Sequence, residues 1–191
     1  MALDTLGNSA LPNAFRFFSQ FIDNVADTEA PQVSGQLQNF MGRFDTTIPP
    51  ELQSTARNLK AIARAFANSE YREQVRQQAV EISNNLSANS LFDILRMILT
   101  VTDTRQLAEH IVVAFYFLFD ILCRMASRSW GQLRQAFDWC YEGIRGVVDP
   151  LVENAGGWGS VFQSVAAGGI FTIIAGMVVG GAVVLGRLIA G

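Results

Sequence analysis

The sequence predicts an all-α protein built around one buried helix, and three observations support this fold class. Residues 108–126, AEHIVVAFYFLFDILCRMA, place apolar side chains on every side of a helix. A helix that is apolar all round lies either inside a bundle or in lipid. The segments on either side carry apolar residues at helical spacing on one face only. No segment shows the alternation of a strand or the turn residues of a hairpin.

The composition narrows the functional class. Of the 191 residues, 50% are hydrophobic and only 16% are charged, which is low for a soluble domain and favours a protein that meets a membrane. The net charge is −3 and the basic residues are scattered, so we expect no nucleic-acid partner. The first residues lack a basic stretch followed by an apolar one, so we expect no secretory signal.

The sequence offers little for catalysis. His110 is the only histidine, so no histidine pair can bind a metal, and we interpret it as a residue at the edge of the core or of a groove. No glycine-rich loop is placed to hold phosphate. Cys123 and Cys140 form no CxxC pair, which fits a reducing compartment. We therefore expect no enzyme, no metal and no cofactor.

The first third of the chain is predicted to contain one helix and one long loop. Residues 1–10 are expected to be flexible and residues 11–163 to form the bundle. An aromatic helix runs from Ala14 to about Val25. Residues 27–49 are polar and contain prolines and glycines, which is typical of a long loop. Three apolar residues in this loop allow a short helical turn: Leu37, Phe40 and Met41.

The remaining helices follow from apolar periodicity and caps. The predicted ranges are 52–68, 71–86, 91–99, 104–126 and 130–148. Asn89-Ser90 and Asp103-Thr104 are predicted caps. Asp149-Pro150 is typical of an N-cap followed by proline at the first helical position, which predicts a new short helix there. Gly156-Gly157 ends it.

The C-terminal segment is predicted to cross a membrane. Val165 to Gly186 comprises 22 residues without a charge. At 1.5 Å per residue such a helix is about 33 Å long, and a bilayer core is about 30 Å thick. We therefore predict a tail anchor over residues 165–187, with the bundle facing the cytosol; the alternative is a buried core helix. Gly176 and Gly180 have a spacing that permits close helix pairing in lipid.

Several short motifs resemble those of the Bcl-2 family of apoptosis regulators, in its Bak/Bax branch. Residues 57–63, RNLKAIA, resemble the third homology motif, the death-motif helix. Residues 111–117, IVVAFYF, resemble the first motif, and residues 14–17 are similar to the start of a family first helix. Residues 153–158, ENAGGW, resemble the second motif through Gly156, Gly157 and Trp158. The resemblance implies a Bcl-2-like bundle whose central helix is wrapped by amphipathic ones.

The resemblance also implies a helix and a groove that accepts such a helix. The anchors of the death-motif helix are Leu59, Ile62, Ala63 and Phe66. The apolar groove residues are Leu91, Leu95, Val113 and Phe117. Recognition of an amphipathic helix by an apolar groove uses anchors at this spacing.

Two positions depart from the family pattern. Arg64 stands where the death motif has Asp, and Leu107–His110 stands where the first motif reads Asn-Trp-Gly-Arg. Since opposite charges can still meet, we hypothesise that Arg64 pairs with Glu109, beside His110, in a dimer or across the groove of one chain. The alternative is that Arg64 lies in solvent.

The function that the resemblance implies is a pro-apoptotic effector, tail-anchored in the mitochondrial outer membrane, that self-associates helix-in-groove and permeabilises the bilayer. Its partners are then Bcl-2 family proteins, a second copy of the chain and lipid; cytosolic or endoplasmic reticulum locations remain open. One alternative is a pro-survival protein whose groove sequesters death-motif helices, which the missing Asp favours. Another is an unrelated pore-forming or membrane-scaffold bundle.

Overall fold

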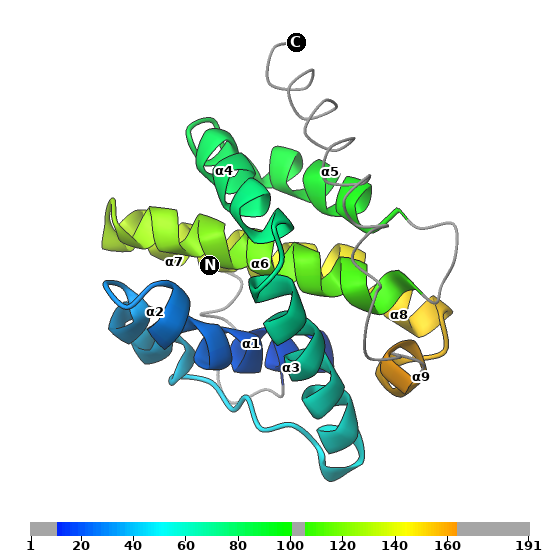
Figure 1. Ribbon diagram of the computed structural model, residues 1–191. Helices are drawn as coiled ribbons and strands as arrows, with labels where there is room; N and C mark the ends of the chain where they lie inside the picture. Colours follow the sequence, from blue (N-terminus) through cyan, green and yellow to red (C-terminus); the bar gives the residue numbers. More distant parts are fainter. Residues whose placement is uncertain (1–10, 101–105, 164–191) are drawn as a thin grey trace.

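A computed structural model describes residues 11–100 and 106–163, and these residues form helices and no strand. Helix α6, Leu107–Ala126, runs through the middle of the bundle (Figure 1). All of its residues are buried except Cys123 and Arg124. The predicted all-α class and the buried central helix are therefore confirmed.

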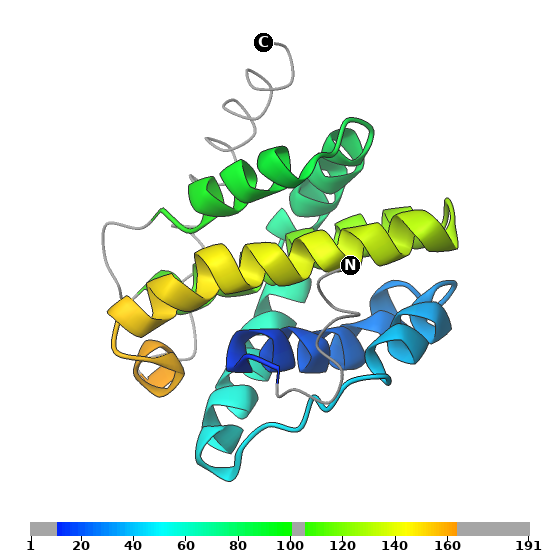
Figure 2. The ribbon, with the colours of Figure 1, turned by 180° about the vertical axis from the view of Figure 1, so that it is seen from behind.

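The other helices wrap around α6. Helices α3 and α4 cross one side of α6 (Figure 1), and α7 runs along the opposite side (Figure 2). These helices are α1 Asn13–Glu29, α2 Ser34–Met41, α3 Gln53–Ala67, α4 Tyr71–Ser83, α5 Ala88–Ile98, α7 Trp130–Gly143, α8 Asp149–Asn154 and α9 Trp158–Gln163. A 3-10 turn, Pro50–Leu52, leads into α3.

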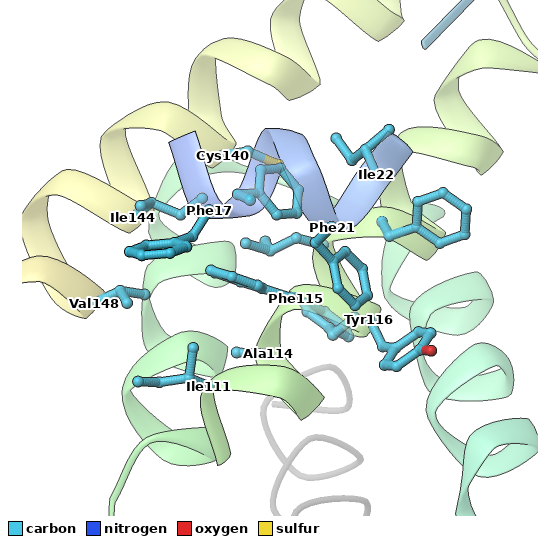
Figure 3. Close-up of a cluster of buried hydrophobic side chains, with 14 of the residues drawn as sticks. Phe17, Phe21, Ile22, Ile111, Ala114, Phe115, Tyr116, Cys140, Ile144 and Val148 are labelled. Atoms are coloured by element: carbon cyan, nitrogen blue, oxygen red, sulfur yellow. The ribbon is translucent and has the colours of Figure 1, made fainter. Parts of the chain in front are cut away.

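Helix α1 supplies an aromatic face to the core. It begins after Pro12 and reaches Glu29, four residues beyond the predicted end. Figure 3 shows side chains of α1 between those of α6 and α7, with Phe21 close to Phe115 and Tyr116 and Phe17 on the side of Ile144 and Val148. The ring of Phe21 meets the ring of Tyr116 edge-on at 4.7 Å between centroids. Such edge-to-face pairs stabilise a core beyond their buried area.

The predicted loop over residues 27–49 is wrong in its central part. Helix α2 occupies Ser34–Met41 and buries the three residues that were expected to form only a turn, Leu37, Phe40 and Met41. The ring of Phe40 stacks on that of Phe137 at 4.1 Å. Three apolar residues give too little periodicity to predict a full helix, and the packing against α7 that stabilises α2 is remote in sequence.

The short helix predicted at Asp149 is present as α8, Asp149–Asn154, with Pro150 in its first turn, but the predicted N-cap that would separate it from the preceding helix is not. Val148 has helical φ and ψ angles of −70° and −52°, and no side-chain cap is present at this point. The chain continues from α7 through a π-helical turn, Ile144–Val148, in which the Asp149 N–H donates to the Ile144 carbonyl. Pro150 lacks an N–H and would clash in a regular helix interior. The local change to π-helical hydrogen bonding accompanies the proline without a break in the helix.

Of the two predicted caps, one lies at a different residue and the other lies outside the described residues. Helix α5 is capped by Ser87, whose hydroxyl accepts from the Ser90 N–H while Ser90 reaches back, two residues earlier than the predicted Asn89 cap. Asp103-Thr104, Gly176, Gly180 and the predicted span over 165–187 lie outside the described residues. Among the helices that the structure does describe, none combines the length and apolarity that a membrane span requires.

Candidate functional site

The apolar anchors of the predicted death-motif helix face the core of their own chain. Leu59, Ile62, Ala63 and Phe66 lie on one side of α3 and are at most 4% exposed. The ring of Phe66 packs against Tyr116 of α6 at 5.2 Å. Helix α3 therefore presents the expected stripe, and the same chain covers it.

Two side-chain hydrogen bonds tie α3 to its neighbours. The Tyr116 hydroxyl donates to the Ala63 carbonyl at 2.8 Å, and burial raises the pKa of this hydroxyl. The Asn58 amide donates to the Phe162 carbonyl of α9 at 2.9 Å. A cavity of about 470 Å³ lies between α1 and α3 and reaches Tyr116, which leaves α3 incompletely packed on that side.

Arg64 lies on the outer face of α3, and the intramolecular form of the predicted pair is wrong. Its side chain is exposed and lines the same cavity as Asp23 and Lys60. Glu109 is 3% exposed and its Oε2 atom has no hydrogen-bond partner. No ion pair joins Arg64 to Glu109 within the described residues.

The six predicted groove residues lie on the packed helices α5 and α6, and all are buried. These residues are Leu91, Leu95, Glu109, His110, Val113 and Phe117. None of them is more than 4% exposed, so they form no open groove in this conformation. A separate cavity of about 560 Å³ opens at the N-terminal end of α6. Its wall includes Leu99, Leu107, Val147 and Leu151.

Two titratable residues that are adjacent in the sequence, Glu109 and His110, are buried at the start of α6. Burial raises the pKa of the Glu109 carboxyl to about 7. It lowers the pKa of the His110 imidazole, whose Nδ1 lies 2.8 Å from the Ile98 carbonyl and donates to it. His110 Nε2 is buried without a partner. This corner of the bundle therefore holds polar atoms that the described residues of this conformation leave unsatisfied.

A buried ion cluster around Arg72 is the part of the site that sequence reasoning missed. Arg72 of α4 is 4% exposed and donates to both carboxylate oxygens of Asp120 on α6, each at 2.7 Å. Its Nε also lies 3.2 Å from the Glu29 carboxylate of α1. The guanidinium stacks over the Tyr116 ring at 4.4 Å. Three helices thus meet at one side chain.

The cluster extends to the surface through Arg76. Its guanidinium binds the Glu29 carboxylate at 2.7 Å and pairs with Glu73, and its side chain is 40% exposed. The only sequence signal for the cluster was Asp120 itself, a single acid within an otherwise apolar run. A buried charge requires a partner, but Arg72 is 48 residues away along the chain.

The second motif has the geometry that its glycines suggest. Gly156 and Gly157 have φ angles of 101° and 97°, which L-residues with a side chain rarely adopt. The turn brings Trp158 into the core, where its ring lies 4.7 Å from that of Phe17. Its Nε1 donates to Asp149 at 3.4 Å. Gly156 and Gly157 therefore form the turn from α8 to α9, and Trp158 anchors the start of α9 against α1.

Nothing in the part of the chain that the structure describes brings three metal-binding side chains together. Cys123 and Cys140 are free thiols, and burial raises the pKa of both. Comparisons of the chain with protein-family models, with curated proteins and with solved structures find no match.

Proposed function

We propose that the chain is a Bak/Bax-like membrane-permeabilising effector of programmed cell death. The observation that carries this proposal is the burial of the α3 anchor stripe against α6 in the same chain. Helix α6 is apolar on all sides, and lipid tails are as apolar as a leucine-rich core. One chain therefore contains a helix suited to a groove and, within α6, an uncharged run, Ile111–Phe119, suited to lipid.

Release of α3 would convert the closed bundle into a self-associating one. The departing helix exposes Leu59, Ile62 and Phe66, and it uncovers the face of α6 that these residues occupied. A second copy can fill that face with its own α3. Such an exchange needs no new surface chemistry, because the contacts already exist within one chain.

The two unpaired charges support the dimeric form of this exchange. Glu109 is buried with an unsatisfied oxygen, whereas Arg64 is exposed. A buried carboxylate without a partner is unfavourable. An exchange that only reproduces the contacts of one chain leaves Arg64 in its exposed position. We therefore propose that, in the dimer, α3 of one copy docks at the groove positions of α5 and α6 of the other, where Arg64 reaches Glu109.

A pro-survival role is the second candidate. The observation that favours it is Arg64, which replaces the acidic residue of the death motif and so weakens α3 as a ligand for a family groove. A pro-survival chain would keep α3 in place and bind the helices of other proteins on α5 and α6.

Dye release separates the two candidates. Purified full-length protein is mixed with vesicles of phosphatidylcholine, phosphatidylethanolamine and cardiolipin that contain fluorescent dextran. An effector releases dextran at a rate that rises steeply with protein concentration. Absence of release, together with tight binding of death-motif peptides, would contradict the effector role and support the pro-survival one. Absence of both would leave the unrelated membrane bundle.

A further inference from the structure

The charges of α6 decide how this helix can enter lipid. Its charged residues are Glu109 in the first turn, Arg124 in the last turn, and Asp120. Side chains near a helix end can reach the membrane interface, whereas a carboxylate deeper in the helix must enter the apolar region. Asp120 is only 8% exposed in the bundle and lies six residues before the end of α6. It is therefore the obstacle to transfer.

The cation that neutralises Asp120 belongs to another helix. Arg72 binds both Asp120 oxygens at 2.7 Å from α4. The same guanidinium is fastened to Glu29 of α1 and stacked on Tyr116. If α6 leaves the bundle alone, Asp120 loses this partner, and Arg72 stays with Glu29.

Among the described residues, Arg72 is the cation that forms an ion pair with Asp120. Arg124 would travel with α6, since it lies four residues after Asp120 on the same helix, but it forms no ion pair with Asp120 in the described structure. The charged groups that act on Asp120 are Arg72 and Arg76 of α4 and Glu29 of α1, and Asp120 in turn raises the pKa of Tyr116 and Cys123 on its own helix. Arg76 is also bound to Glu29 and Glu73. Burial raises the pKa of the Asp120 carboxyl, and Arg72 opposes that rise.

We propose that the Arg72–Asp120 ion pair is the lock that keeps α6 in the protein, so that α6 passes into lipid only after this pair is undone or Asp120 is neutralised. The inference rests on the proposed membrane function and adds the structural element that controls it. In the bundle, Arg72 compensates the charge of Asp120, so α6 can be buried there. Without Arg72, the charge of Asp120 opposes insertion of α6 into lipid. The ion pair thereby couples insertion to the prior displacement of α4.

The decisive variant replaces both partners by apolar residues of similar size, Arg72→Met with Asp120→Leu. Replacement of a buried ion pair by packed apolar side chains is often neutral or stabilising, whereas removal of one partner leaves a buried charge. Asp120→Leu alone is the second variant, because Arg72 keeps Glu29. The matched control is Arg96→Met with Asp93→Leu, which removes the exposed pair of α5 at 3.2 Å.

Two readouts separate the lock from the proposed function. All proteins carry Cys140→Ala, so that a fluorescent label on the partly exposed Cys123, three residues beyond Asp120, reports on α6. Quenchers attached to the lipid chains of cardiolipin-containing vesicles measure insertion of α6, and dextran release measures permeabilisation. Thermal unfolding without vesicles verifies that each variant is folded.

The lock predicts that the double variant and Asp120→Leu insert α6 at least several-fold faster than the wild type, while the control inserts at the wild-type rate. Equal insertion by a folded double variant and the wild type would overturn the lock. Faster insertion without any dextran release would uphold the lock and contradict the proposed permeabilising function. Faster insertion by the control as well would also overturn the lock, because loss of any ion pair would then suffice.

Discussion

Two acids of α6, Glu109 and Asp120, are buried in different electrostatic surroundings. Asp120 has a bidentate arginine, and Glu109 has no hydrogen-bonded partner for its Oε2 atom. Desolvation acts on both, but only Asp120 has an opposing cation. Glu109 therefore stabilises the bundle only if its carboxyl is protonated, whereas Asp120 does so through its ion pair with Arg72.

This difference predicts a pH-dependent effect of Glu109→Gln. The pKa of Glu109 is about 7 in the folded chain, above its ordinary value of 4.5, so the folded state binds the proton more tightly. The penalty for burial is then complete above pH 7 and disappears as the pH falls towards 4.5. We expect Glu109→Gln to raise the free energy of unfolding by about 3 kcal/mol at pH 8, with little effect at pH 4.5.

Urea denaturation of both proteins at the two pH values measures this difference. His110 is present in both, so its own titration cancels. Glu81→Gln, on the exposed side of α4, is the control and should change the free energy of unfolding little. A gain from Glu109→Gln that is equal at both pH values would contradict the account of Glu109.

Tyr116→Phe tests the tie between α6 and α3. The substitution keeps the ring beneath Arg72 and beside Phe66, and it removes only the hydroxyl that donates to Ala63. We expect the free energy of unfolding to fall by about 1 kcal/mol, because one buried hydrogen bond is lost. Hydrogen exchange of α3 amides should accelerate more than that of α7. Uniform acceleration in both helices would show that the hydroxyl does not specifically hold α3.

At the scale of helices, Gly143 at the end of α7 lies directly against α5. A Cβ atom at this position would lie 2.7 Å from Leu95 Cδ1 of α5 and 3.4 Å from the Phe92 ring. Gly143 is thus the residue that lets α7 and α5 pack together over the groove positions. The sequence shows only a glycine within an apolar stripe, and nothing in it indicates the partner.

Gly143→Ala is predicted to destabilise the bundle, by about 1–3 kcal/mol, because Leu95 is fully buried and must shift. The matched control is Gly131→Ala on the same helix, where a Cβ meets nothing within 4 Å. That substitution should stabilise the chain by several tenths of a kcal/mol through helix propensity. Thermal unfolding of the two variants decides, and similar shifts for both would contradict the packing argument.

The helices that sequence predicts well are those whose pattern is local and long. The run Ile111–Leu122 contains enough apolar residues to identify α6 as a core helix. Helix α2 has a pattern too short to separate it from a turn, and its burial depends on Phe137, about a hundred residues later. The π-helical turn before Pro150 could not be predicted, because an Asp-Pro pair is expected both at a helix N-cap and after a π-helical turn within a continuous helix.

In the candidate site, too, features set by local sequence were predictable and contacts between distant residues were not. The stripe of α3 and the Gly156-Gly157 turn were predictable from spacing and from the freedom of glycine. The pairing of Arg72 with Asp120 was not, because charge partners from distant helices leave no periodic signal. Arg64 and Glu109 were paired on the basis of a family pattern, and the folded single chain keeps them unpaired.

At the scale of the whole molecule, one bundle contains both parts of the proposed exchange, namely α3 and the face of α6 that α3 covers. Arg64 is exposed and Glu109 is buried, so their encounter requires a second copy and a displaced α3. A double-mutant cycle tests this encounter. We expect Arg64→Gln and Glu109→Gln each to weaken self-association on vesicles several-fold, while the double variant loses no more than either single one.

Chemical cross-linking on vesicles at several protein concentrations measures each association constant. Lys60→Gln is the control, since Lys60 is also exposed, four residues before Arg64 on α3. It should leave association near the wild-type value. Additive losses in the double variant would mean that the two residues act independently.

On the proposed mechanism, α3 leaves the bundle when the chain meets a membrane. Hydrogen exchange of α3, Gln53–Ala67, measured by mass spectrometry with and without cardiolipin-containing vesicles, follows this departure. We expect slow exchange of α3 in solution and fast exchange during dextran release. Dextran release while α3 stays as protected as it is in solution would show that α3 does not leave the bundle.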